Sequence, residues 1–355
     1  MLLTIIKTIF ILSGFSLKLP NQTQILATLH TLLLPILRSL SDGQFHSGTQ
    51  LAQQLQVSRA SICNILAGAT DIGIAVNKVR GRGYQLASRP DWLNADSIRA
   101  AMPRHIAGYI IDIVDSIDST NAALLRASDD APHRHCLIAE RQTAGRGRRG
   151  RVWQSVLGGS LTCSIRWRFN QGIATLAGLS LAVGVALIRS LNQLGCTGVQ
   201  LKWPNDVLSQ QRKLAGILIE VQGDMNGPSV AIIGIGINIQ LPATTRAHID
   251  QAVTDIQEVL GVPLSRNTLL ATLLTELAEV MEEFERNGLH NLRTEWQTAH
   301  AYANQAVQIH MSNGQIIQGI AAGLADNGAL LLHTDDGKQI SVHSGEVHSA
   351  RKFTS

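Results

Sequence analysis

The spacing of apolar residues changes twice along the chain, and each change indicates a new domain. Within residues 47–69, apolar residues recur every three or four positions, as in short amphipathic helices. Between residues 96 and 298, strand-length apolar runs alternate with longer helical patterns over 175–194 and 267–287. After residue 302, short alternating runs are separated by Asn-Gly and Asp-Gly turns, as in antiparallel strands. The pattern predicts a multidomain α+β protein.

These changes divide the chain into four predicted parts. Residues 1–30 form an extension, residues 31–90 a helical module, residues 96–298 a mixed α/β body and residues 299–355 a small SH3-like β-barrel. The apolar run Thr8–Leu17 in the extension is too short to span a bilayer, and no A-x-A cleavage pattern follows it. We expect a poorly ordered extension on a cytoplasmic protein that binds no membrane. A weak secretory signal is the alternative.

The helical module predicts a winged helix-turn-helix. Ser47 and Ser58 each precede an apolar-periodic stretch, where a hydroxyl can cap a helix, and Gln56-Val57 supplies the turn. Two strands then flank Arg80-Gly81-Arg82-Gly83, as in a basic wing. The apolar stretch Thr31–Leu40 at the start of the module is expected to be helical after Pro35. A plain helical hairpin is the alternative. The candidate DNA contacts are the helix-turn-helix Gly48–Ala67 with Arg59, Arg80 and Arg82.

The distribution of charge agrees with this division. Residues 1–90 contain eight Lys and Arg against two acids, whereas the remaining residues contain 22 against 24. A basic module attached to a nearly neutral body is typical of a polyanion-binding domain joined to an enzyme. The four cysteines are scattered without C-x-x-C spacing, which predicts buried thiols and neither a disulfide framework nor a zinc site.

The stretch GRGRRGRVW, Gly145 to Trp153, is the strongest chemical signal in the body. Glycines let backbone N–H groups approach a ligand, and arginines supply forked donors for carboxylate and phosphate oxygens. A solvated basic loop is the alternative, and we expect Trp153 to pack against the base of the loop.

Lysine usage marks two further positions. Between residues 79 and 337 only Lys202 and Lys213 are lysines, whereas arginines are frequent. A lysine ammonium is a compact point charge, so these two positions are candidates for binding a phosphate or carboxylate. Chance in an arginine-rich sequence is the alternative. Lys202 begins KWPND, whose Asp206 can cap a turn or hold Mg²⁺. Asp118-Ser119-Thr120-Asn121, read alone, is a helix N-cap.

Together, DSTN, GRGRRG, KWPND and RKLAGIL resemble the bifunctional biotin protein ligases, which also repress biotin-synthesis genes. The resemblance covers residues 31–355. It implies that the chain forms biotinyl-5′-AMP from biotin and ATP with Mg²⁺, and transfers biotin to a lysine of the biotin carboxyl carrier protein of acetyl-CoA carboxylase. It also implies operator DNA as a partner, biotinyl-5′-AMP as corepressor, and a ligand-dependent homodimer.

The resemblance implies three overlapping sets of site residues. The catalytic set is Lys213, Arg148 and Asp206, with Asp206 the candidate Mg²⁺ ligand. The biotin-binding set is Ser119, Thr120, Asn121, Gln142, Gly145, Arg146, Gly147, Arg148, Lys213 and Gly216. The ATP and adenylate set is Arg146, Arg148, Arg149, Arg151, Lys202, Asn205, Asp206, Lys213 and Asn238.

Two departures from the family pattern weaken parts of this prediction. The second helix of the module lacks basic residues after Ala60 and contains Gly68, which would cost roughly 1 kcal/mol in a helix interior. The segment Thr244–Glu258 has no aromatic residue to stack on adenine. A biotin-sensing DNA regulator with a vestigial ligase site and a lipoate-attaching enzyme are the alternative functions, although the intact loop disfavours both.

Overall fold

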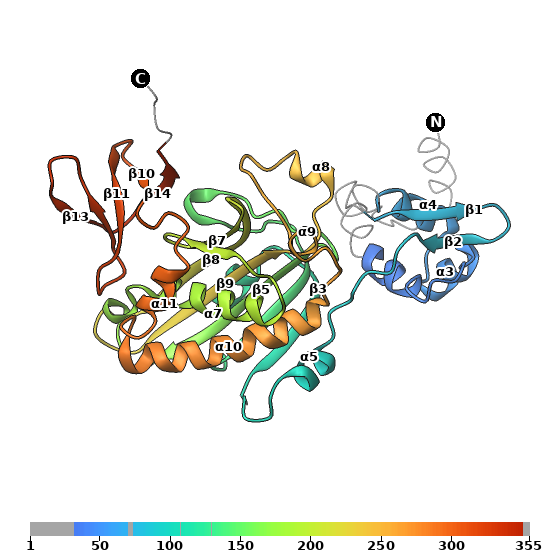
Figure 1. The fold of residues 1–355 in the computed structure, drawn as a ribbon. Coiled ribbons are helices and arrows are strands. Elements are labelled where there is room, and N and C mark those ends of the chain that lie inside the picture. The colour runs from blue at the N-terminus through green and yellow to red at the C-terminus, as the bar shows by residue number, and fades with distance from the viewer. Residues whose placement is uncertain (1–31, 70–73, 107, 129, 351–355) are drawn as a thin grey trace, which may run out of the picture. The chain divides into compact units, whose positions relative to one another are not determined.

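The computed structural model describes residues 32–350, apart from 70–73, 107 and 129 (Figure 1). The predicted extension 1–30 lies outside the described residues. The chain divides into two compact units, Met1–Arg89 and Pro90–Ser355. No helix in the described part of the chain is long and apolar enough to cross a membrane.

The first unit has the predicted winged helix-turn-helix. Residues 32–39 form a helix that includes Pro35 and does not start after it. The helices α3 (Gly48–Gln54) and α4 (Arg59–Ala67) follow, and β1 (Val76–Val79) pairs antiparallel with β2 (Gly83–Leu86). Both expected caps are present: the hydroxyls of Ser47 and Ser58 each accept a backbone N–H at 3.0 Å. Buried Leu37, Leu51, Ile62 and Leu66 form the core.

One expectation about α4 is wrong. Gly68 is the C-cap that ends the helix and does not lie in its interior. Its N–H is satisfied by the carbonyls of the last turn, so the predicted destabilisation does not arise.

The second unit is built on a seven-stranded sheet of order β3-β4-β5-β9-β8-β7-β6. Only β3 and β4 run parallel to each other. The strands are β3 (Ile110–Ile117), β4 (His135–Gln142), β5 (Ser160–Phe169), β6 (Val199–Lys202), β7 (Asp206–Ser209), β8 (Arg212–Gly223) and β9 (Ser229–Asn238).

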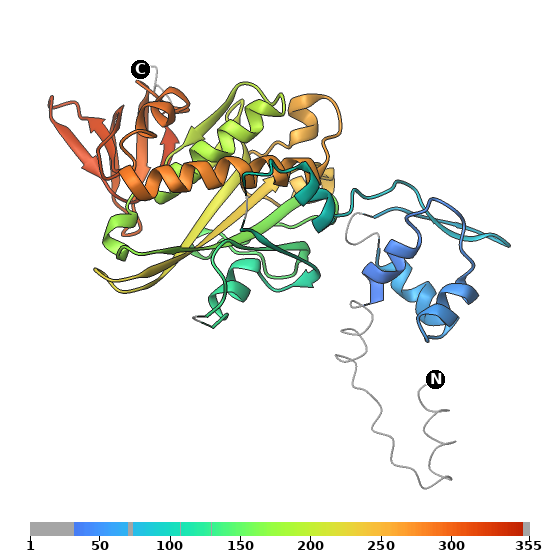
Figure 2. The same ribbon diagram turned by 90° about the horizontal axis from the view of Figure 1, so that it is seen from below.

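Helices cover both faces of this sheet. The long helices α7 (Leu179–Gln193) and α10 (Arg266–Asn287) lie side by side on one face (Figures 1 and 2). The short helix α6 (Thr120–Leu125) packs on the other face, where its Leu124 meets Leu137 and Ile232. Because side chains alternate along a strand, Cys136 and Ile138 beside Leu137 face the main core.

The last strands of the chain form a separate five-stranded antiparallel sheet of order β13-β12-β11-β10-β14. Its strands are β10 (Ala306–His310), β11 (Ile316–Leu324), β12 (Leu330–His333), β13 (Gln339–Val342) and β14 (Glu346–Ser349). This sheet stands where the small barrel was predicted. It follows α11 (Arg293–Thr298), and its buried side chains join the core of the larger sheet.

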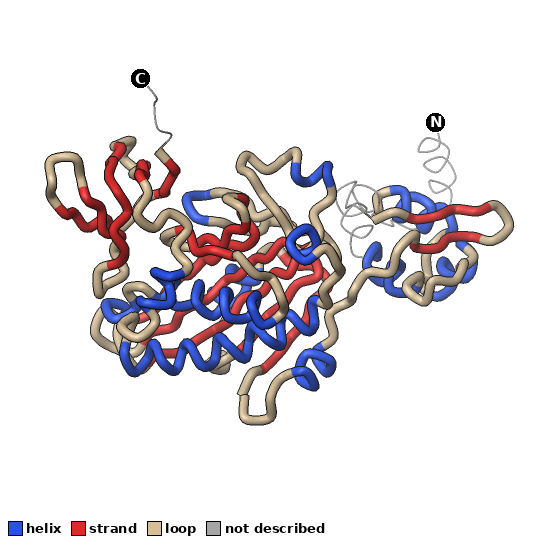
Figure 3. The backbone as a smooth tube through the Cα atoms, viewed as in Figure 1, coloured by secondary structure: helices blue, strands red, loops and turns tan. Residues whose placement is uncertain are grey.

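The loops between these elements carry short helical pieces, visible in Figure 3. They are α5 (Ala95–Ala101), η2 (Arg148–Gly150), η3 (Ile173–Leu176), α8 (Ala243–Arg246) and α9 (Ile256–Leu260).

The start of the second unit is held by a buried ion pair. Arg266, in the first turn of α10, lies 2.7 Å from Glu140 of β4, and both side chains are fully buried. Arg266 also donates to the carbonyl oxygens of Asp91 and Ser160, while Glu140 accepts the backbone N–H of Leu93. Residues 91–93 are thereby fixed to the strands of the large sheet.

Candidate functional site

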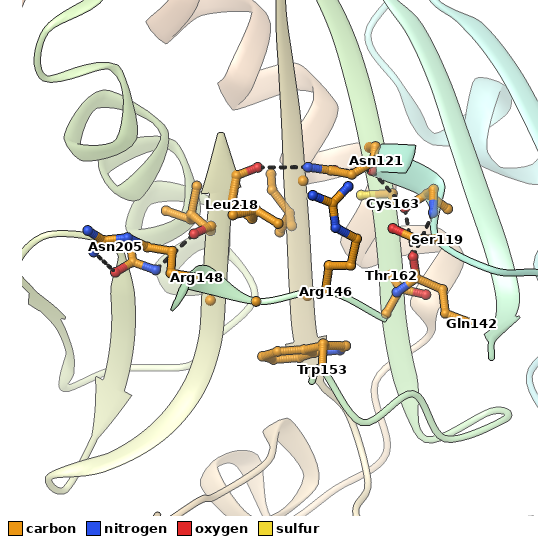
Figure 4. A pocket seen from close by; sticks show the side chains of 18 of the residues that line it. Ser119, Asn121, Gln142, Arg146, Arg148, Trp153, Thr162, Cys163, Asn205 and Leu218 are labelled. Atoms are coloured by element: carbon orange, nitrogen blue, oxygen red, sulfur yellow. Dashed lines mark hydrogen bonds between the residues drawn. The ribbon is translucent and has the colours of Figure 1, made fainter. Parts of the chain in front are cut away.

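A polar pocket of about 470 Å³ lies where α6, β5, β8 and β9 meet the glycine-rich loop (Figure 4). All of the predicted biotin contacts except Gly145 line this pocket. Gly145 lies at the base of the loop, where a Cβ would collide with the backbone of Trp153.

One end of the pocket is a closed hydrogen-bond network. Ser119 is the N-cap of α6, as predicted, and the next two residues turn inward. The backbone N–H and the hydroxyl of Thr120 donate to Gln142 Oε1 at 2.7 and 3.0 Å. The hydroxyl of Ser164, on β5, lies 2.7 Å from Thr120 Oγ1 and 2.5 Å from Asn121 Oδ1. Donors and acceptors therefore alternate on a rigid surface.

The floor of the pocket is made by glycines. Gly234 and Gly236 are two positions apart on β9, so they face the same side of the sheet. A Cβ at Gly234 would collide with the amide of Asn121, and one at Gly236 would collide with the indole of Trp153. These glycines admit the polar network and the indole into the pocket. Trp153 therefore lines the pocket in addition to packing at the base of the loop, where only the packing was predicted.

The glycine-rich loop crosses the pocket with its arginines directed to different partners. Arg146 Nη2 lies 2.6 Å from Glu220 Oε1 on β8, and Arg148 Nη1 donates to Asn205 Oδ1 at 2.9 Å. Burial lowers the pKa of Arg148, and the neighbouring Arg149 lowers it further. A half-buried cation beside a second cation is stabilised by an anion, so this part of the loop favours binding of an anion.

The other two loop arginines contact the C-terminal sheet. Arg151 forms a two-pronged ion pair with Glu346 on β14, with N–O distances of 2.9 and 2.6 Å. Arg149, at φ 55°, donates to the carbonyl oxygen of His310 on β10. The C-terminal sheet therefore fixes one side of the loop, while Arg146 and Arg148 remain directed toward the polar pocket.

A basic pocket of about 620 Å³ adjoins the polar pocket, and the two share Arg148, Asn205 and Lys213. Lys213 Nζ lies 2.9 Å from Asp206 Oδ1, and both side chains are 15% exposed. Burial lowers the pKa of Lys202, which also lines the basic pocket, although Asp206 opposes this effect. All of the predicted ATP contacts except Arg146 and Asn238 line the basic pocket.

A wider hollow of about 1420 Å³ continues from the basic pocket, with which it shares Lys202, Asp206 and Lys213. Residues 248–252 of the segment without aromatic residues form one wall. Tyr302, from the turn before β10, also lines this hollow, so an aromatic ring is supplied from elsewhere in the chain. Lys202 and Lys213 thus lie in the basic pocket, between the polar pocket and this wider hollow.

Comparisons with known proteins identify this arrangement. Residues 113–238 match the model of the biotin/lipoate A/B protein ligase family, residues 302–348 the biotin protein ligase C-terminal domain, and residues 33–85 a helix-turn-helix domain. The bifunctional ligase/repressor BirA of Escherichia coli is 38% identical over 89% of this chain and 99% of its own length. The chain belongs to the bifunctional ligase/repressor family of biotin protein ligases.

Other members of the family agree. The biotin–[acetyl-CoA-carboxylase] ligase of Mycobacterium tuberculosis is 34% identical over 67% of this chain and 88% of its own length. The solved structure of the Aquifex aeolicus biotin protein ligase with biotin and ATP superposes with a TM-score of 0.58 at 27% identity, covering 68% of this chain and 99% of that one.

Asn238, which was predicted to contact ATP, lies outside the polar and basic pockets. Asn238 is buried, and its amide donates to the backbone carbonyls of Lys213 and Thr254 at 3.3 and 3.1 Å. The structure does not bring it to the polar or basic pocket, so its contacts support the strand that carries Lys213.

Several residues at the site were not predicted from the sequence. Thr162 and Ser164 line the polar pocket but are ordinary strand residues with no local signal. Glu220, which accepts a hydrogen bond from Asn121 beside the pocket, lies beyond the end of RKLAGIL. Gly234 and Gly236 did carry a signal, because paired glycines on one strand face indicate close approach to a ring or ligand.

In the first unit, the arginines predicted to contact DNA lie close together. Arg59, Arg80 and Arg82 line one hollow of about 970 Å³ with Lys78 and the start of α3. The guanidinium of Arg82 lies 4.1 Å from the ring centroid of Phe45, and Lys78 Nζ contacts Cys63 Sγ at 3.4 Å. The wing and the second helix thus present one basic surface.

In the described residues, no group of three or more His, Cys, Asp and Glu side chains could hold a metal ion. The four cysteines are free thiols; Cys136, Cys163 and Cys196 are buried as predicted, whereas Cys63 is only half-buried.

Proposed function

We propose that the chain is a biotin protein ligase whose polar pocket binds biotin and whose basic pocket binds ATP. The observation that carries this assignment is the continuity of the two pockets through Arg148, Asn205 and Lys213. A carboxylate bound in the polar pocket would reach these residues together with a phosphate from the other side.

The polar network suits the ureido ring of biotin, which has both donors and acceptors. Thr120, Asn121 and Gln142 are oriented by their own hydrogen bonds, so little side-chain entropy is lost when a ligand binds. The indole of Trp153 supplies apolar surface for the rest of the ligand.

The first reaction joins two anions. A biotin carboxylate oxygen attacks the α-phosphorus of ATP, the bond to the β-phosphate breaks, and pyrophosphate leaves. Lys213 and Arg148 lower the repulsion between the reactants and stabilise the charge that develops. Lys202, Arg149 and Arg151 line the same pocket and would hold the remaining phosphates.

Asp206 is the candidate for holding Mg²⁺. The ion is commonly bound by one or two carboxylates together with substrate phosphates, so one carboxylate in the basic pocket fits this role. In the free protein Lys213 pairs with Asp206 and keeps the two charges balanced.

The second reaction transfers biotin. The ε-amine of a lysine on the biotin carboxyl carrier protein attacks the acyl carbon, AMP leaves, and the amine loses a proton as the amide forms. Until then the glycine-rich loop excludes water from the acyl-adenylate. We propose that this transfer takes place in the cytoplasm.

The experiment is to incubate the purified chain with ATP, Mg²⁺ and biotin and to measure pyrophosphate and biotinyl-5′-AMP. Release of one pyrophosphate per site, followed by labelling of the carrier protein, is expected. The same assay with lipoate tests the alternative substrate. Pyrophosphate release with lipoate and none with biotin would overturn the assignment.

A second function, repression of biotin-synthesis genes, is favoured by the basic surface of Arg59, Arg80 and Arg82. We propose that biotinyl-5′-AMP acts as corepressor by ordering the glycine-rich loop and so promoting a homodimer that matches a two-fold operator.

A further inference from the structure

Glu220 joins the glycine-rich loop to the biotin end of the polar pocket. Its Oε1 lies 2.6 Å from Arg146 Nη2, and its Oε2 accepts the amide N–H of Asn121 at 2.9 Å. The side chain is 22% exposed, so its carboxylate is partly shielded from water. We propose that Glu220 is a positioning residue that holds the loop closed and fixes the orientation of Asn121. This inference rests on the proposed role of the polar pocket in binding biotin.

The orientation of Asn121 follows from the chemistry of its neighbours. A carboxylate only accepts hydrogen bonds, so the side of the amide facing Glu220 must be the NH₂ group. That group also donates to the carbonyl oxygen of Leu218 at 3.2 Å (Figure 4). Asn121 Oδ1 is then presented to Ser164 and to the pocket. Without Glu220, only the Leu218 carbonyl would favour this orientation on that side.

The contact with Arg146 has a different consequence. Arg146 belongs to a loop whose other arginines are held by the C-terminal sheet and by Asn205, so Glu220 ties down the edge that crosses the polar pocket. The Arg146 side chain is 45% exposed, which limits the strength of the pair in water. A moderate contact of this kind favours the closed loop in the free protein without fixing it, so a bound anion can still take Arg146 and order the loop further.

Glu220→Gln separates these roles from simple packing. A glutamine has nearly the same shape but only one acceptor oxygen, so it can satisfy either Asn121 or Arg146 but not both. Glu220→Asp keeps two acceptors on a shorter chain and is expected to recover part of the effect. Glu295→Gln is the matched control, because Glu295 also pairs with an arginine, Arg189 at 2.8 Å, but its carboxylate bonds neither Asn121 nor Arg146.

The first test is limited trypsin digestion of the full-length protein, with cleavage after Arg146, Arg148, Arg149 and Arg151 quantified by mass spectrometry. Free Glu220→Gln protein should be cut in the loop roughly fivefold faster than wild type, whereas Glu295→Gln should match wild type. With biotin and ATP present, all the proteins should become equally protected. Equal loop cleavage of the free Glu220→Gln and wild-type proteins would overturn the proposal, and this readout does not depend on any ligand.

The second test is kinetic. Glu220→Gln should raise the KM for biotin roughly fivefold while kcat for pyrophosphate release stays near wild type. A fall in kcat with unchanged KM would refute a positioning role. Failure of wild-type protein to use biotin would instead refute the proposed substrate and leave the digestion result standing.

Discussion

The two lysines of the ligase body show how single residues define the site. Lys202 and Lys213 both line the basic pocket, and both lie near Asp206. Gly216 gives Lys213 its position, because a Cβ there would lie only 3.1–3.2 Å from the end of the lysine side chain. A compact ammonium can approach both a carboxylate and a phosphate at this point, which a broader guanidinium would not.

Lys213→Ala is expected to slow adenylate formation severely with the fold intact. Removing one preorganised charge of this kind reduces kcat by roughly 10²- to 10³-fold, and the variant also leaves Asp206 without its ion-pair partner. The measurement is pyrophosphate release, with circular dichroism as the check on folding and Lys338→Ala as a surface control. Wild-type rates in a folded Lys213→Ala protein would contradict the assignment.

How much the sequence could predict at this scale depended on local signals. Thr120 and Gln142 belong to recognisable motifs, and the structure does bring them together across 22 residues of sequence. Ser164 and Glu220 complete the same network but stand in strands where any small polar or charged residue is ordinary. An asparagine at the end of a strand can face a ligand or the backbone with equal ease, and the amide of Asn238 donates to backbone carbonyls.

At the scale of elements, the glycine-rich loop is held at three points. Glu220 binds Arg146, Asn205 binds Arg148, and Glu346 binds Arg151. The sequence indicated the chemistry of this loop but not these anchors, because they come from positions 57 to 195 residues away along the chain. The C-terminal sheet therefore contributes directly to the shape of the catalytic site.

Arg148→Ala should release the reactive intermediate prematurely. The loop is expected to retain the adenylate by charge and by closure, and this variant removes both a half-buried cation and the contact with Asn205. Free biotinyl-5′-AMP in the medium and biotin on lysines of an added bystander protein are the readouts. Arg146→Ala should act in the same direction. Unchanged retention in both variants would show that the loop has another role.

The buried pair that fixes the start of the second unit gives a stability prediction. Arg266→Met leaves Glu140 charged and buried without this partner, which is expected to cost about 3–5 kcal/mol of unfolding free energy. Arg266→Met with Glu140→Leu should recover part of that loss. Arg189→Met, which breaks the half-exposed pair with Glu295, should cost less than about 1 kcal/mol. Denaturant midpoints measure all three, and equal losses in the two single variants would contradict the argument.

At the scale of the whole molecule, the chain combines two compact units that the charge distribution had already separated. The first unit carries the excess of basic residues and the second carries the pockets. Hydrophobic spacing indicated the boundary near residue 90, because each of these units buries its own core; the C-terminal sheet, for which it indicated a further boundary, shares the core of the second unit. It could not predict whether one unit responds to the ligand state of the other.

DNA binding by the first unit is expected to depend on a small number of phosphate contacts. The described cations on the basic surface of one copy are Arg59, Lys78, Arg80 and Arg82, which can neutralise at most about four phosphates, for a log–log salt slope of roughly −3 to −4. A dimer on a two-fold operator should double this slope to roughly −7. Fluorescence titration on DNA upstream of biotin-synthesis genes, at several salt concentrations, measures both.

Tight binding with the steeper slope is expected only when biotin and ATP are both present, since the acyl-adenylate would order the loop and promote the dimer. Replacing Arg80 and Arg82 by alanine should reduce the dimer's slope by about 3 to 4, since two phosphate contacts are lost in each copy. A slope near −3 that does not change with ligand would indicate a monomer bound without regulation. Equal affinity for operator and unrelated DNA under both conditions would refute the repressor function and leave the ligase assignment untouched.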